Sequence, residues 1–274
     1  MAERRQMTAM NQMWLGISGR VVAVTGANGG IGRATVRALL EQGARVAMLD
    51  RETLPSADLK ALLADTTGEC ITIACDVADD AHVAAAAAEV SQRLGNCYGL
   101  VNNAALTMPG HLKDVSIADW SRQFDVNLTG YLRCAQAFAK SMLANGEGSI
   151  IHVASIAGSN VQGYSCGYST TKAAILMLSR QLAFEWGPLG VRSNAISPGL
   201  IETPLTRAFY ADAQLREQRE KAVPLRRIGQ PQDIADVAAF LLSGRSAYVN
   251  GAEITVDGGF TQTLMSHIPR PGRS

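Results

Sequence analysis

Tyr168 and Lys172 are the two side chains whose types and spacing point most directly to chemistry. Four residues apart in a stretch of helical character, they project from the same face of a helix. A free tyrosine has a pKa near ~10 and is a poor base at neutral pH, but a neighbouring ammonium group favours the phenolate. Ser155 ends a predicted strand shortly before this helix, and its hydroxyl can hold a substrate oxygen while Tyr168 exchanges a proton. Each residue alone is commonplace, so the prediction of proton-transfer chemistry rests on the set.

A glycine-rich segment, Thr25-Gly-Ala-Asn-Gly-Gly-Ile-Gly32, lies between the first predicted strand and the first predicted helix. Glycine lets the backbone approach a ligand closely, and a helix start presents free N–H groups and a positive dipole end to a pyrophosphate. The spacing G-x-x-x-G-x-G differs from the common G-x-G-x-x-G fingerprint, so close strand–helix packing alone is the alternative. The residues that we predict to contact a dinucleotide here are Gly26, Asn28, Gly29, Gly30 and Ile31.

Asp50 ends the second predicted strand, about 20 residues beyond the glycines, where an acidic side chain can bind both ribose hydroxyls of an adenosine. A 2′-phosphate would meet a like charge there, so Asp50 favours NAD over NADP, although the adjacent Arg51 could serve such a phosphate. Ligands of open parallel sheets bind at the carboxyl ends of the strands. Further candidates follow the third and fourth predicted strands: Asp76, Val77, Asn103, Ala104 and Ala105.

Short apolar runs alternate with helical segments along the chain, which predicts an α/β fold with a doubly wound parallel sheet covered on both faces. Strands are expected at 20–25, 44–50, 70–76, 98–102, 148–155, 191–197 and 253–256. Helices are expected at 31–42, 57–64, 79–94, 118–143, 166–186 and 231–242. Asn127 lies inside the longest of these helices, where asparagine is a weak helix former. No linker or charge block divides the series, so we expect one domain.

Composition narrows the function further. Hydrophobic residues make up 47% and charged residues 18%, which excludes a disordered chain. Lys+Arg 25 against Asp+Glu 24 gives a net charge of +1, so nothing favours nucleic acid or a membrane surface as partner. The five cysteines form no C-x-x-C and the four histidines no H-E-x-x-H, so we predict no metal site. With no apolar run of a secretory signal near the N-terminus, free thiols predict a cytoplasmic protein.

Two predicted helices carry more apolar surface than contact with a sheet requires. Between Lys172 and Glu185 the apolar residues spread wider than a single stripe. We therefore predict self-association through this helix and the helix at 118–143, as a homo-oligomer and most simply a homotetramer. The alternative is that other segments of the same chain cover this apolar surface.

Several motifs taken together resemble the short-chain dehydrogenase/reductase family, from about residue 19 to 260. They are Gly26-x-x-x-Gly30-x-Gly32, Asn102-Asn103-Ala104, Asn127, Ser155, Tyr168-x-x-x-Lys172, Pro198-Gly199 and Val256-Asp-Gly-Gly259. The resemblance implies one Rossmann-type domain at 19–260 with a seven-stranded, mainly parallel sheet in the order 3-2-1-4-5-6-7. It also implies a flexible arm at 1–18, a substrate lid at about 200–226, charged and irregular over 204–224, and a C-terminal tail at 261–274.

The resemblance also assigns roles. Tyr168 would be the general acid/base and Ser155 the group that polarises the substrate. Lys172 would lower the tyrosine pKa and bind the nicotinamide ribose, and Asn127 would hold a water of a proton relay. The loop expected to hold the nicotinamide carboxamide contains Pro198, Gly199, Ile201 and Thr203.

The implied activity is NAD-dependent interconversion of a secondary alcohol and a ketone. Ala105 stands where many members have glycine, which narrows the pocket beside the nicotinamide. A neutral or weakly polar small substrate is expected from the predicted lining, Ala105, Met108, Ala157, Tyr164 and Leu205.

Three alternatives stay open. The first is reduction of a 3-oxoacyl thioester on acyl carrier protein. Against it, Gly29 stands where those NADPH-dependent reductases have arginine, and residues 134–149 contain only Lys140 as a basic group. The second is a sugar, polyol or cis-dihydrodiol dehydrogenase. The third is a dinucleotide-sensing scaffold without catalysis, because a fold alone never implies activity.

Overall fold

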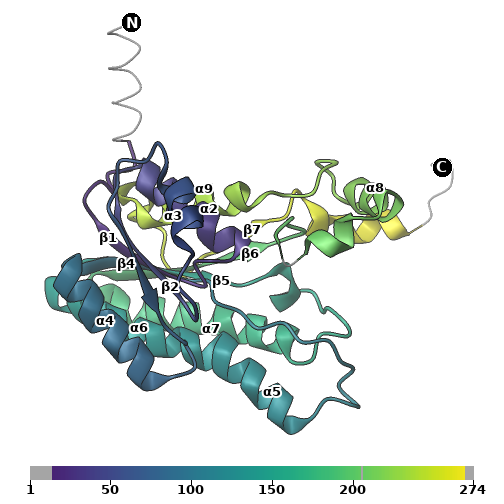
Figure 1. Cartoon of the computed structure of the whole chain (residues 1–274). Coiled ribbons are helices and arrows are strands. Elements are labelled where there is room, and N and C mark those ends of the chain that lie inside the picture. The colour runs from purple at the N-terminus through teal and green to yellow at the C-terminus, as the bar shows by residue number, and fades with distance from the viewer. Residues whose placement is uncertain (1–13, 205, 269–274) are drawn as a thin grey trace, which may run out of the picture.

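The computed structural model describes residues 14–204 and 206–268, and its centre is a seven-stranded sheet (Figure 1). The strand order is β3-β2-β1-β4-β5-β6-β7, as expected, and every neighbouring pair is parallel rather than most of them. The strands are β1 (Val21–Thr25), β2 (Arg45–Asp50), β3 (Cys70–Ala74), β4 (Cys97–Asn102), β5 (Gly148–Val153), β6 (Val191–Pro198) and β7 (Glu253–Val256). This order confirms the doubly wound fold.

Helices cover both faces of the sheet (Figure 1). On one face lie α2 (Gly30–Glu41), α3 (Ser56–Leu63) and α9 (Pro231–Leu242). On the other lie α4 (Asp80–Arg93), α6 (Gly130–Asn145) and α7 (Tyr168–Trp186), with α5 (Ile117–Phe124) beside α7. The central strands β1 and β5 are buried along their whole length, because apolar side chains on both faces of each strand meet a helix layer. No helix in the described ranges is long and apolar enough to cross a membrane.

The long helix expected at 118–143 is interrupted. Between α5 and α6 the chain forms a π-helical turn, η1 (Asp125–Thr129), and Asn127 lies buried in its middle. Such turns widen a helix locally and are frequent at functional sites. Asparagine is a weak helix former, and at Asn127 the structure has an irregular π turn in place of regular α-helix.

The expectation of irregular chain over 204–224 is wrong. A short 3-10 helix, η4 (Arg207–Tyr210), and the helix α8 (Ala213–Ala222) occupy most of this segment. The side chain of Asp212 accepts hydrogen bonds from the backbone N–H groups of Gln214 and Leu215, which begins the helix. Ion pairs one turn apart continue it, such as Lys221 with Glu217. The helix lacks an apolar stripe because it lies at the edge of the molecule (Figure 1), so periodicity did not reveal it.

The ends of the chain also differ from expectation. Within the arm expected at 1–18, Ile17 is buried in the core and the Trp14 carbonyl accepts a hydrogen bond from Arg245, so residues 14–18 are held in place. Residues 1–13 lie outside the described residues. The tail expected from 261 begins as a 3-10 helix, η6 (Phe260–His267), and 269–274 lie outside the described residues.

Candidate active site

Ser155, Tyr168 and Lys172 come together at the carboxyl end of β5. Ser155 follows this strand and caps the short helix η2 (Ile156–Gly158), its Oγ accepting from the Ala157 N–H at 3.1 Å. Tyr168 opens α7, and its hydroxyl is hydrogen-bonded to Ser155. A Cβ on Gly158 would lie 2.9 Å from the backbone of Lys172, so only glycine lets η2 pack this tightly on α7. The predicted trio is therefore assembled by one close helix contact.

Lys172 is a buried cation without an acidic partner among the described residues. Its Nζ donates to the Val153 carbonyl at 2.7 Å and lies 5.5 Å from the centre of the Tyr168 ring. Burial lowers the pKa of Lys172 to about 7, because the charged form loses its hydration. Burial also raises the pKa of Tyr168, and the hydrogen bond with Ser155 only partly opposes it. Burial is the stronger effect in this structure, so the net shift of the Tyr168 pKa is upward and not the lowering expected from Lys172.

Asn127 fixes the loop that follows β4. Its Oδ1 accepts from the Leu106 N–H at 2.7 Å, and its Nδ2 donates to the Leu106 carbonyl at 3.0 Å. The same Nδ2 lies 3.3 Å from Thr171 Oγ1, which ties this loop to α7. Gln123, buried one turn earlier, donates to the same carbonyl at 3.1 Å. Gln123 was not among the predicted site residues, although its i, i+4 spacing from Asn127 is a signal that points to it.

Hydrogen bonds join the glycine-rich loop after β1 to the loop after β4. Thr25 Oγ1 accepts from the N–H groups of Asn103 and Ala104, and Asn103 Nδ2 donates to the Thr25 and Gly26 carbonyls. Gly26 has a φ of +60°, and a Cβ there would lie 2.7 Å from Ala104 Cα. The loop therefore requires glycine, and it forms a cradle that a side chain would fill. Thr25 was not among the predicted site residues.

Asp50 lies beside this cradle, at the end of β2. Its two carboxylate oxygens accept from the N–H groups of Asn28 and Arg51 at 2.9 and 2.8 Å. Asn28 in turn donates from its side chain to the Glu52 carbonyl at 2.6 Å. The carboxylate is thereby held at the rim of the glycine loop, where it has lone pairs left for ribose hydroxyls. The chemistry of these residues fits the adenosine half of a dinucleotide.

Asp76 and Val77 follow β3 at the same edge of the sheet. The Asp76 side chain accepts from the Ala78 N–H at 2.9 Å, and Val77 packs against Gly130 at the start of α6. These contacts hold the turn but leave the Asp76 side chain only partly buried. The turn therefore stays available to a ligand at this edge.

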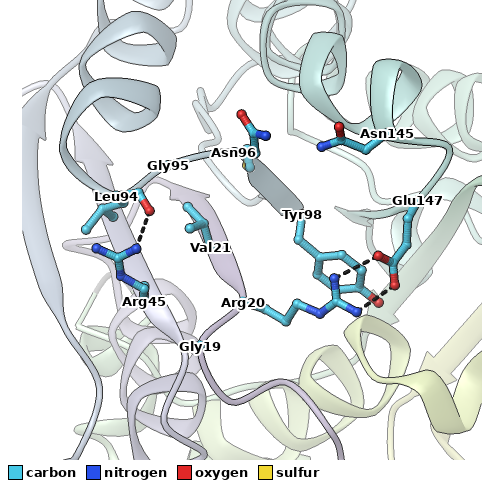
Figure 2. A pocket seen from close by; sticks show the side chains of 11 residues that line it. Gly19, Arg20, Val21, Arg45, Leu94, Gly95, Asn96, Tyr98, Asn145 and Glu147 are labelled. Carbon is cyan, nitrogen blue, oxygen red and sulfur yellow. Dashed lines mark hydrogen bonds and ion pairs between the residues drawn. The ribbon is translucent and has the colours of Figure 1, made fainter.

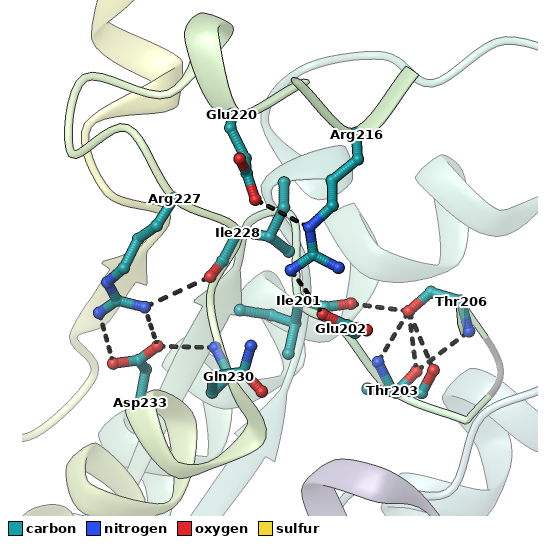
Figure 3. Close-up of polar contacts among 10 residues, drawn as sticks. All are labelled: Ile201, Glu202, Thr203, Thr206, Arg216, Glu220, Arg227, Ile228, Gln230 and Asp233. Carbon is teal, nitrogen blue, oxygen red and sulfur yellow. Dashed lines mark hydrogen bonds and ion pairs between the residues drawn. The ribbon is translucent and has the colours of Figure 1, made fainter. Parts of the chain in front are cut away.

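Pro198 ends β6, and the segment predicted as a lid follows from Gly199 and packs against the glycine loop. A Cβ on Gly30 would lie 2.9 Å from the side chains of both Thr203 and Pro204. Figure 3 shows how the lid is held: Thr206 Oγ1 donates to the Ile201 carbonyl at 2.8 Å and accepts from the Thr203 N–H at 2.8 Å.

Arg216 ties α8 to the base of this lid. Its guanidinium forms ion pairs with Glu202 at 3.0 Å and Glu220 at 2.9 Å (Figure 3). Neither Arg216 nor Thr206 was predicted as a site residue. Their contacts depend on how this segment folds, which the sequence pattern does not indicate.

The predicted substrate lining is only partly assembled. Ala157 is buried, Met108 is half-buried, and Ala105 and Tyr164 are exposed. The Tyr164 ring lies edge-on to the His111 ring, with 4.9 Å between the ring centroids. This contact joins the loops after β4 and β5. Leu205 lies outside the described residues.

Two hollows of the described structure lie elsewhere, at the amino ends of the strands. One of about 330 Å³ is lined by Arg20, Arg45, Tyr98 and Glu147 among others (Figure 2). A second, of about 540 Å³, adjoins it and contains Arg192. Neither touches the predicted site. Within the described ranges, no group of three or more His, Cys, Asp or Glu side chains could hold a metal ion.

Comparisons with known proteins show what the chain is similar to. Residues 26–261 match the protein family described as "Enoyl-(Acyl carrier protein) reductase". The chain is 38% identical over 247 residues to the acetoacetyl-CoA reductase of Synechocystis, covering 89% of this chain and 97% of that protein. It is 37% identical over 245 residues to the D-threitol dehydrogenase of Mycolicibacterium smegmatis, covering 89% and 94%.

A solved structure extends the likeness to three dimensions. The gluconate 5-dehydrogenase of Burkholderia cenocepacia, solved with NADP and tartrate, superimposes with a TM-score of 0.82 at 34% identity. The match covers 90% of this chain and 97% of the other. Proteins of this family bind a nicotinamide dinucleotide and act as dehydrogenases or reductases. The chain belongs to the short-chain dehydrogenase/reductase family.

Proposed function

We propose that the protein is an NAD-dependent oxidoreductase that interconverts a secondary alcohol and a ketone, with Tyr168 as general acid/base. The observation that carries this proposal is the assembly of Ser155, Tyr168 and a buried Lys172 at the carboxyl edge of the sheet, the same edge at which the glycine loop lies. A scaffold that only senses dinucleotides has no need of a buried cation without a carboxylate partner.

Each side chain has one task in the proposed reaction. The Ser155 hydroxyl donates a hydrogen bond to the substrate oxygen and fixes it beside Tyr168. In oxidation the Tyr168 phenolate takes the alcohol proton, and in reduction the phenol returns it. The Lys172 ammonium stabilises the phenolate electrostatically. A nicotinamide dinucleotide held by Lys172 and the loop at Ile201 and Thr203 would supply the hydride acceptor in oxidation and the hydride donor in reduction.

Asn127 is proposed to support a water relay between Lys172 and solvent. Its side-chain amide is committed to Leu106 and Thr171. The relay water would therefore be held by the backbone of the π turn rather than by this amide.

The dinucleotide would be held along the carboxyl edge of the sheet. The pyrophosphate would lie at the start of α2, the adenosine ribose on Asp50, and the nicotinamide beside the lid. The residues proposed to hold it are Gly26, Asn28, Gly29, Gly30, Ile31, Asp50, Arg51, Asp76, Val77, Asn103, Ala104, Ala105, Tyr168, Lys172, Pro198, Gly199, Ile201 and Thr203. The NADP in the Burkholderia structure makes NADP the rival cofactor, with Arg51 as the residue that would receive its phosphate.

Two substrate classes compete with a simple alcohol. Similarity to D-threitol dehydrogenase and gluconate 5-dehydrogenase favours a polyol or sugar acid. Similarity to acetoacetyl-CoA reductase favours a 3-oxoacyl thioester. A half-buried Met108 and an exposed Tyr164 at the expected mouth support a small, weakly polar substrate over a charged one.

Self-association and a cytoplasmic setting complete the proposal. Phe184 on α7 is 83% exposed and Ile117 on α5 is 79% exposed, so the helices predicted to pair carry uncovered apolar side chains. A homotetramer through these helices would bury them, and Phe184→Glu should then reduce the mass measured by light scattering. The five free cysteines suit a reducing compartment.

The test is a rate measurement at the NADH absorbance band across secondary alcohols, polyols and 3-oxoacyl thioesters, with NAD and with NADP. We expect turnover of at least one alcohol and a higher kcat/KM with NAD. Asp50→Ala should lower kcat/KM for NAD by about 10-fold or more and leave NADP little changed. Activity with thioesters but with no alcohol would contradict the proposal, and so would activity with NADP but not with NAD.

A further inference from the structure

Tyr131 and Lys172 share one hydrogen-bond acceptor inside the protein. The Tyr131 hydroxyl donates to the Val153 carbonyl at 3.0 Å, and Lys172 Nζ donates to the same oxygen at 2.7 Å. Both side chains are buried, Tyr131 on α6 and Lys172 on α7. A carbonyl oxygen has two lone pairs, so these two donors saturate it.

The Tyr131 ring also stabilises charge on the lysine. Lys172 Nζ lies 5.5 Å from the centre of the Tyr131 ring, the same distance as from Tyr168. Both distances fall within the ~6 Å range of cation–π attraction, which is stronger for a desolvated cation. Within the described residues no carboxylate pairs with Lys172. Two aromatic rings and one carbonyl are therefore the features that favour its ammonium form against burial.

The position of Tyr131 is set by neighbours other than the lysine. Its ring stacks on His152 of β5, with 5.8 Å between centroids and 22° between planes. Its backbone carbonyl accepts from Asn102 Nδ2 at 3.0 Å. Burial, together with the nearby Lys172 charge, lowers the pKa of His152 to about 3, so this ring stays neutral. The titratable groups that face Lys172 are thus Tyr168 from α7, Tyr131 from α6 and His152 from β5.

We propose that Tyr131 is a positioning residue for Lys172, an inference that rests on the catalytic role proposed above. Its ring holds the lysine in the charged form that stabilises the Tyr168 phenolate. Its hydroxyl weakens the hold of the Val153 carbonyl on Nζ, because the oxygen's negative charge is divided between two donors. When Nζ turns to the nicotinamide ribose, the Tyr131 hydroxyl remains on that carbonyl, so the buried acceptor keeps a partner.

Two substitutions separate the ring from the hydroxyl. Tyr131→Leu removes both, and we expect the rising limb of kcat/KM against pH in alcohol oxidation to move up by about one pH unit. The direction follows because a neutral lysine no longer favours the phenolate. Tyr131→Phe keeps the ring, so the limb should stay within about 0.3 unit of wild type. The carbonyl then holds Nζ alone, and we expect the Kd for NADH to rise about 3- to 10-fold.

Tyr98→Phe is the matched control. The Tyr98 hydroxyl donates to the Leu242 carbonyl at 3.0 Å, and a cation, Arg20, lies over its ring at 4.3 Å (Figure 2 shows both side chains). This tyrosine has the same chemistry as Tyr131 at the opposite edge of the sheet. Removing the Tyr98 hydroxyl should change neither the rising limb of kcat/KM against pH nor the Kd for NADH.

The outcomes distinguish this inference from the proposed function. A folded Tyr131→Leu with the wild-type limb, or Tyr131→Phe with the wild-type Kd for NADH, overturns the positioning role. If Tyr131→Leu does not fold by circular dichroism, the Kd of Tyr131→Phe decides alone. Wild-type protein that binds no dinucleotide, or Tyr168→Phe with full turnover, overturns the proposed function instead.

Discussion

Lys172 and Arg20 are two cations placed over tyrosine rings at opposite edges of one sheet, and their surroundings give them opposite properties. Arg20 is half-exposed and donates to both oxygens of Glu147, at 2.8 and 2.6 Å (Figure 2). The hydrogen bond with Glu147 raises the pKa of Arg20, so its charge is permanent. Lys172 is buried on a backbone carbonyl, and its pKa falls to about 7. Burial without an opposite charge is what makes a cation titrate at neutral pH.

The hollow at one edge of the sheet is not the candidate active site, which lies at the opposite edge. The hollow beside Arg20 has a volume of about 330 Å³, yet its cations Arg20 and Arg45 are each neutralised by a carboxylate. At the opposite edge Thr203 and Pro204 pack on Gly30 of the glycine loop. We therefore place the proposed reactive end of the sheet where protonation is perturbed, at Tyr168 and Lys172.

Removing each cation tests the comparison most strongly. Lys172→Met should lower kcat/KM by about 10²- to 10⁴-fold, the usual contribution of a proton-transfer group. Arg20→Met should stay within about 2-fold of wild type, because its ion pair is exposed. Steady-state rates of both variants with one substrate decide the matter. Equal losses would mean that burial has no bearing on function.

The same substitution should change the pH dependence of stability. A buried lysine with a folded-state pKa of about 7 and an unfolded value near ~10.4 binds fewer protons when folded between these two pH values. Stability therefore rises with pH across this window, and the penalty for burying the charge is fully present below it. Lys172→Met lacks this penalty, so its free energy of unfolding should exceed that of wild type by a few kcal/mol at about pH 6 and equal it near pH ~10. Urea unfolding at the two pH values measures the difference, and a gap that does not shrink with pH would contradict it.

Arg216 is an intermediate case, a half-exposed cation with two carboxylate partners at the lid. Arg216→Ala should loosen α8 from Glu202 and raise KM for the dinucleotide about 2- to 5-fold, with kcat unchanged or slightly higher. A lid that governs release predicts this split. Unchanged KM and kcat would show that the ion pair has no part in holding the lid.

Glu147→Gln should have the smallest effect. It breaks an exposed pair far from the site, so we expect stability to fall by less than ~1 kcal/mol and kcat/KM to stay at the wild-type value. Thermal unfolding and one rate measurement are sufficient. A loss of activity here would connect the two edges and break the contrast.

Periodic patterns of buried strands and amphipathic helices predicted a doubly wound parallel sheet, and the resemblance to the family supplied the strand order that the structure has. It did not reveal α8, which has no apolar stripe, and it placed residues 14–18 in a flexible arm although Ile17 reaches the core. Such features depend on contacts between distant segments.

The site was predictable to the same extent. Ser155, Tyr168 and Lys172 carry recognisable chemistry at a recognisable spacing. Thr25, Gln123 and Tyr131 do not, because each acts through the backbone of a loop or strand far along the chain. Only the folded structure shows that Tyr131 and Lys172 meet at the Val153 carbonyl.

The most direct test of the account is Tyr168→Phe, with Tyr98→Phe as its control. The phenyl ring keeps the packing on α7 and the cation–π contact with Lys172, but it removes the group that exchanges the proton. We predict NADH binding within about 2-fold of wild type and a loss of turnover of at least ~10²-fold in Tyr168→Phe, with wild-type turnover in Tyr98→Phe. Wild-type turnover in Tyr168→Phe would contradict the central claim.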